Sequence, residues 1–104
     1  MDKQEIIETL KSQYNRDLRK QLVRTLLDAE KTDNTLKQYK LMNQIFSYVL
    51  SQLGWEMAKN TGNWDSTPLE VMDEVFPKIS TSKWFMEQKL TTKKHIDLKM
   101  DGTE

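Results

Sequence analysis

The chain has 104 residues, of which 37% are hydrophobic and 31% are charged, and its 16 basic and 16 acidic side chains cancel. This length indicates a single domain, and the zero net charge provides no global field to recruit nucleic acid or an anionic membrane. The absence of cysteine excludes disulfides, thiolate zinc sites and cysteine nucleophiles, and no apolar run has the length of a membrane span, so we expect a soluble, cytoplasmic protein.

The first 30 residues predict two helices rather than one. Asp2 is a good N-cap, with Glu5 three residues later. Two apolar arcs follow, one of Ile6, Ile7, Leu10 and Tyr14 and the other of Leu18, Leu22, Val23, Leu26 and Leu27. At about 100° per residue these arcs are turned by more than a right angle, so a straight helix cannot point both at one core. We expect a break near Asn15–Asp17; the alternative is one long helix that contacts different partners along its length.

A helix near residues 36–59 has the strongest apolar pattern in the chain. Thr35 and Gln38 have the spacing of a capping box. One apolar face consists of Tyr39, Met42, Phe46, Val49, Leu53 and Met57, and a second sector consists of Leu41, Ile45, Tyr48 and Trp55. A helix that is apolar over most of its circumference is normally buried, so we expect this one to be the central helix.

The remaining sector of this helix contains small residues, namely Ser47, Ser51, Gly54 and Ala58. Small side chains would let another backbone approach closely. Gly54 also offers an alternative end to the helix, because glycine is common just after helix C-termini. We expect the helix to continue through Gly54, since packing can outweigh the cost of about 1 kcal/mol relative to alanine.

Two shorter helices are predicted in the second half. Thr67, Pro68 and Glu70 form a strong N-terminal signal for a helix that runs to about Val75 and is ended by Pro77. Its expected inner face is Leu69, Met72, Val75 and Phe76. A fourth helix is expected from about Ser82 to Leu90, with Trp84 and Phe85 among its apolar residues.

The last residues, 91–104, are expected to be a polar tail outside a helical domain of residues 1–90. Ile96, Leu98 and Met100 alternate with charged residues, which is a strand pattern. Such a tail is disordered, lies along the domain's own groove, or adds to a sheet edge of a partner or a second copy. In the last case these three residues bind the partner.

The sequence offers no recognisable catalytic or metal-binding set. His95 is the only histidine, and nothing marks a partner for it. The segment from Asp97 to Gly102 resembles the start of a calcium loop, but Lys99 stands where an oxygen ligand is required. We therefore expect no metal, no cofactor and no enzymatic activity. The rival enzyme hypothesis requires Asp65, Glu70, Asp73 and Glu74 to converge in a pocket.

A basic segment provides the alternative function of a nucleic-acid-associated regulatory protein. It contains Arg16, Arg19, Lys20 and Arg24, which together with lysines of the tail could contact phosphates. These four residues form no coherent stripe on a helical wheel. Two of them have acids at helical spacing, in the pairs Asp17–Lys20 and Arg24–Asp28, so we expect local ion pairs and a solvated face.

Protein binding is therefore the favoured function. The expected fold is all-α, a small bundle of four or five helices around the central helix, with an extended or disordered tail. The expected partner is another protein, identity open, and self-association remains an alternative. Trp64 and Asp65 lie in a polar loop and are candidate contacts. Residues 65–76 contain four acids and no base, whereas residues 78–94 contain five lysines and one acid; such a two-signed surface could orient a partner.

Overall fold

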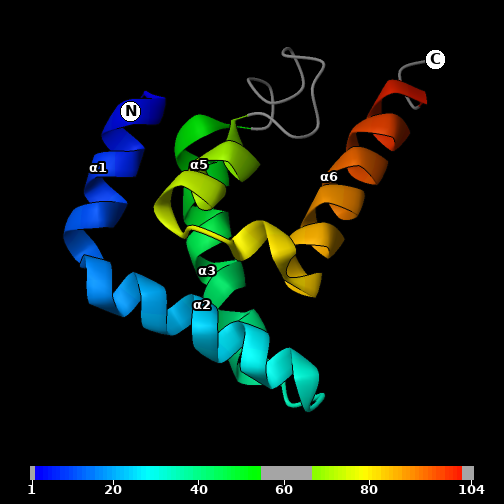
Figure 1. Ribbon diagram of the computed structural model, residues 1–104. Coiled ribbons are helices and arrows are strands. Elements are labelled where there is room, and N and C mark those ends of the chain that lie inside the picture. The colour runs from blue at the N-terminus through cyan, green and yellow to red at the C-terminus, as the bar shows by residue number, and fades with distance from the viewer. Residues whose placement is uncertain (1, 55–66, 102–104) are drawn as a thin grey trace.

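The computed structural model describes residues 2–54 and 67–101, and the side chains of 2–54 and 67–92. These residues form five α-helices and one 3-10 turn, and no strand occurs among them. In chain order the elements are α1 (Lys3–Gln13), α2 (Arg16–Lys31), α3 (Leu36–Leu53), α5 (Pro68–Val75), η1 (Ile79–Thr81) and α6 (Lys83–Asp101). The expected all-α fold is confirmed, and Figure 1 shows the short α5 lying against α3 and beside α1.

The predicted break between the first two helices is confirmed. The carboxylate of Asp2 accepts a hydrogen bond of 2.8 Å from the backbone N–H of Glu5 and so caps α1. The side chain of Asn15 accepts one of 3.0 Å from the N–H of Leu18 and caps α2. The two helices meet at a sharp angle (Figure 1), which allows both apolar arcs to face one core.

The prediction that α3 continues through Gly54 is wrong. The helix ends at Leu53, and Gly54 follows with φ of +81° and ψ of 146°. A side chain at this position would have open space around it, so the backbone conformation, and not crowding, favours glycine here. The remainder of the predicted helix, residues 55–59, lies outside the described residues.

The other expectations for α3 are confirmed only in part. Its inner face is buried through Met42, Ile45, Phe46, Val49 and Leu53. Ser47 and Ser51 are exposed, so no backbone packs closely on them. The capping box is also wrong: Thr35 has helical dihedrals and its side chain caps nothing, while Oε1 of Gln38 is buried without a hydrogen-bond partner.

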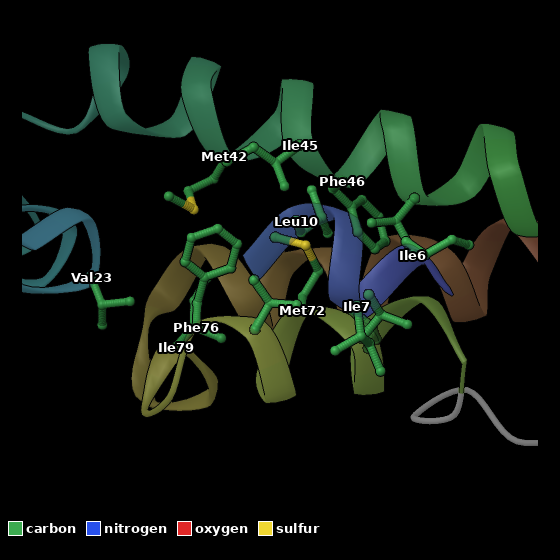
Figure 2. Close-up of a cluster of buried hydrophobic side chains, with 14 of the residues drawn as sticks. Ile6, Ile7, Leu10, Val23, Met42, Ile45, Phe46, Met72, Phe76 and Ile79 are labelled. Atoms are coloured by element: carbon green, nitrogen blue, oxygen red, sulfur yellow. The ribbon is translucent and has the colours of Figure 1, made fainter. Parts of the chain in front are cut away.

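The most completely buried helix is α5, not α3. Five of its eight residues are buried, whereas α3 buries five of 18. It packs against α1, α3 and η1. Figure 2 shows Met72 and Phe76, from α5 and the residue after it, facing side chains of α1 and α3. At its start, Glu70 accepts a hydrogen bond of 3.0 Å from the N–H of Thr67, which stabilises this helix of only two turns.

The start of α6 is tied firmly to the rest of the fold. The indole N–H of Trp84 donates a hydrogen bond of 2.7 Å to Oδ1 of Asn43, and the Trp84 ring meets Phe46 edge to face, with the ring centroids 5.8 Å apart. The Trp84 side chain is fully buried. Leu90, in contrast, is 64% exposed, whereas Thr92 is buried.

The strand predicted around Ile96, Leu98 and Met100 is wrong. The backbone is helical as far as Asp101 (Figure 1). The period-two alternation on which the prediction depended describes a strand, whereas the backbone here has the helical period. A helix that is already nucleated at Lys83 adds residues at little cost, and leucine, lysine and methionine are good helix formers.

Candidate functional site

One acidic side chain is enclosed where three helices meet. Glu30, near the end of α2, is only 7% exposed. Its Oε1 accepts a hydrogen bond of 3.0 Å from the N–H of Lys83, and its Oε2 accepts bonds from the N–H of Trp84 at 2.9 Å and from the hydroxyl of Tyr39 at 3.0 Å. The positive N-terminal end of α6 also favours the carboxylate. Glu30 therefore joins α2, α3 and α6, and its oxygens are already occupied.

The tyrosine in this arrangement is held in its neutral form. Burial raises the pKa of Tyr39 far above its usual value, and the hydrogen bond to Glu30 raises it further. The hydroxyl therefore remains a donor to the carboxylate at neutral pH. This pair is suited to holding helices together, and it provides no base for a reaction.

The four basic residues singled out in the sequence divide into two groups. The guanidinium of Arg19 donates from Nε to the carbonyl of Tyr14 at 2.7 Å and from an Nη to the carbonyl of Val75 at 3.1 Å. Arg19 thereby ties the start of α2 to the end of α5. Arg16, Lys20 and Arg24 are exposed.

Lys20 and Arg24 line an open groove of about 410 Å³. Its other lining residues are Val23, Leu27, Asp28, Lys31, Pro77 and Lys78. One wall is therefore a stripe of α2, and the other is the turn between α5 and η1. A second hollow, of about 400 Å³, is lined by Leu27, Glu30, Lys31, Thr81 and Lys83.

Because the two hollows share Leu27 and Lys31, they adjoin at the C-terminal half of α2 and form one surface, which we call the α2 groove. Its apolar floor consists of Val23, Leu27 and Pro77. Its rim has five basic side chains, those of Lys20, Arg24, Lys31, Lys78 and Lys83. The rim has one carboxylate without a partner, that of Asp28.

The rim charges are not neutralised within the described part of the chain. An ion pair joins Lys3 to Glu70 at 3.2 Å, away from the groove, and within residues 2–54 and 67–92 no basic residue of the rim takes part in one. The local pairs predicted for Asp17 with Lys20 and for Arg24 with Asp28 are not formed. All five basic residues are exposed. The chain thus concentrates positive charge in one groove although its net charge is zero.

The three described acids of the rival enzyme hypothesis, Glu70, Asp73 and Glu74, do not line this groove. Glu70 accepts hydrogen bonds from the N–H of Thr67 and from Lys3, which lower the pKa of its carboxyl, the backbone bond more than the lysine. Asp73 and Glu74 are exposed. No three histidine, cysteine, aspartate or glutamate side chains within the described segments are placed to hold a metal ion.

Several predicted contacts lie beyond what the structure describes. Trp64 and Asp65 are outside the described residues. The helical backbone of α6 includes Ile96, Leu98 and Met100. Their side chains are outside the part of the chain that the structure describes. The described helices include none that is both long and apolar enough to cross a membrane.

The sequence reasoning missed the second wall of the groove. It noted the excess of lysine after residue 78 but did not connect Lys78 and Lys83 with α2. One signal was present: Lys20, Arg24, Leu27 and Lys31 follow the spacing of one helical stripe. Comparisons of the chain with family models, with curated proteins and with solved structures return no match. The α2 groove is therefore the feature from which we infer function.

Proposed function

We propose that the chain is a non-enzymatic binding module and that another protein, through an acidic segment, docks in the α2 groove. The observation that supports this proposal is the combination of an apolar floor with an unpaired basic rim in one groove. Apolar area buried at an interface provides affinity, and complementary charge provides orientation and a faster encounter. The partly buried Leu27 and the exposed Pro77 supply such area next to the charges.

The walls of the groove are fixed before a partner arrives. Arg19 and Glu30 anchor α2 near both of its ends. The opposite wall, at Lys78, lies between Phe76 and Ile79 in the chain, and both of these side chains are fully buried. A surface held in its binding conformation loses little conformational entropy when it binds, so this groove is better suited to docking than a mobile loop would be.

Site-specific photo-crosslinking tests this function. A photoreactive amino acid replaces Arg24 in one version of the chain and Lys11, an exposed residue of α1, in a matched control. Both versions are produced in the native host and irradiated. We expect a discrete protein adduct at position 24 only, and its loss when Lys78→Glu is added across the groove. Equal adducts at both positions, or none at position 24, would contradict the proposal.

Nucleic-acid association is the second candidate, because Arg16, Lys20 and Arg24 are all exposed on α2. Lysines after residue 92 would add to the contact. Arg19 is less suited, because its guanidinium already binds two backbone carbonyls. Binding to labelled DNA at increasing salt discriminates the two functions: a nucleic-acid-associated protein binds DNA with an affinity that falls steeply with salt, whereas a purely protein-binding module binds DNA only weakly at any salt concentration.

A further inference from the structure

We infer that the occupant of the α2 groove is an acidic, amphipathic helix of about three turns, selected against uniform polyanions by Asp28. This inference rests on the proposed function and specifies its partner. The groove follows α2 from Lys20 to Lys31, a length of about 16 Å at about 1.5 Å per residue. About three turns of a second helix match that length.

A helical occupant fits the floor better than an extended one. Lys20, Arg24, Leu27 and Lys31 follow one stripe of α2 along the groove, and side chains at this spacing form a ridge of the kind that packs against a second helix. An extended peptide gains affinity mainly by pairing its backbone with a free strand edge. The described segments, 2–54 and 67–101, contain no strand. The floor therefore favours side-chain packing of a helix.

The order of charges along the groove restricts the occupant further. Along α2, Lys20 and Arg24 come first, Asp28 follows, and Lys31 comes last. Lys83 adds to the cations near Lys31, since the two residues line the same hollow. A complementary helix has acids toward both ends and a basic or neutral residue opposite Asp28. One carboxylate thus selects the register as well as the partner.

Asp28 and the floor together disfavour nucleic acid. A phosphate backbone repeats negative charge at short, regular intervals, so one phosphate would lie against the Asp28 carboxylate. The backbone also offers no apolar surface to cover Leu27 and Pro77. A nucleic-acid site is expected to have basic side chains with no carboxylate among them. The α2 groove has the Asp28 carboxylate among its basic residues.

Four synthetic peptides test the inference on the full chain. The matched peptide is an amphipathic 14-mer with leucines along one face, glutamates toward both ends and a central lysine. The second has a central glutamate, the third has serine for leucine, and the fourth has all charges reversed. Oligothymidine serves as the nucleic-acid probe. Fluorescence anisotropy gives each affinity, and amide NMR shifts locate the binding.

We expect the matched peptide to bind at least about tenfold more tightly than the other three, with amide shifts along α2. Arg24→Glu should weaken it about tenfold, as should Lys78→Glu on the opposite wall, whereas Lys11→Glu on α1 should leave its affinity unchanged. Asp28→Asn should tighten binding of the central-glutamate peptide and of oligothymidine, so that the preference for the matched peptide is lost.

Three results would overturn the inference: no binding of the matched peptide, equal binding of the serine peptide, or tighter binding of oligothymidine. The first two results leave the proposed function standing if the photoreactive residue at position 24 crosslinks to a protein. Only the helical, amphipathic character of the occupant is then wrong. If position 24 gives no protein adduct and oligothymidine binds in the groove, the proposed function fails together with the inference.

Discussion

Helix α2 presents charged side chains of two kinds. Arg19 and Glu30 turn inward, and together they make five hydrogen bonds to other parts of the chain. Arg24 and Lys31 are on the same helix and make no hydrogen bond or ion pair within the described residues. The two kinds cannot be told apart by residue type. They differ in whether the fold supplies a partner for the charge.

This difference separates stability from binding. A charge that already has internal partners contributes to the folded state, and its removal leaves buried donors or acceptors unsatisfied. A charge without internal partners can be changed at little cost to folding. We therefore expect substitutions of Arg19 and Glu30 to lower stability and substitutions on the rim of the α2 groove to affect binding alone.

The largest effect is expected for Glu30→Ala. It leaves the backbone N–H groups of Lys83 and Trp84 and the hydroxyl of Tyr39 without their acceptor. We expect a loss of about 3 kcal/mol in the free energy of unfolding, measured by urea denaturation. Asp28→Ala, one half-turn away on the exposed side, is the matched control and should change it by less than about 0.5 kcal/mol. Equal effects of the two variants would contradict the distinction.

Arg19→Ala should have the next largest effect. The carbonyls of Tyr14 and Val75 lose their donor, and α2 loses its tie to the end of α5. A decrease of about 2 kcal/mol in the free energy of unfolding is expected. Arg24→Ala provides the comparison at the same residue type and should stay within about 0.5 kcal/mol of the parent chain. A destabilising Arg24→Ala would show that the rim takes part in the fold.

Tyr39→Phe should cost about 1 kcal/mol at neutral pH, because Glu30 loses one of three donors. It should also flatten the alkaline limb of the stability curve. The pKa of Tyr39 is raised in the folded chain above its ordinary value of 10.0. Its stabilising contribution is therefore complete below pH 10 and is lost as the pH rises above that value. Parallel alkaline limbs for the two chains would rule out this role.

The smallest effect is expected at the exposed Lys3–Glu70 pair. Lys3→Ala should lower the free energy of unfolding by only about 0.3 kcal/mol, since water screens the pair. Glu70 has a pKa below its ordinary value of 4.5, so its contribution is present above that pH and lost as the pH falls through the lowered pKa. Glu70→Gln should therefore reduce the acid sensitivity of thermal unfolding, and unchanged acid sensitivity in this variant would contradict the role of the pair.

Capping residues and the direction of apolar arcs predicted two of the helix boundaries correctly. The turned apolar arcs located the break that Asn15 caps, and the sequence from Thr67 to Glu70 located the start of α5. The extent of α6 was missed, because a short alternating pattern was given more weight than the helix that precedes it. The end of α3 was also missed, because a positive φ at Gly54 depends on the path of the chain that follows.

The groove and the Glu30 junction could not be predicted in the same way. Both depend on residues far apart in the sequence, such as Glu30 with Trp84 and Arg24 with Lys78. Periodicity describes which side of a helix is apolar, but it does not say which helix lies opposite. The sequence therefore showed the basic residues, and only the fold separated Arg19, which binds internally, from those that line the groove.

The most direct test of the central claim is to measure stability and binding on one variant, Arg24→Glu/Lys78→Glu. The free energy of unfolding should stay within about 0.5 kcal/mol of the parent chain, and affinity for the matched acidic peptide should fall by more than about tenfold. A loss of stability comparable to that of Glu30→Ala, or an unchanged affinity, would contradict the claim that these charges are reserved for a partner.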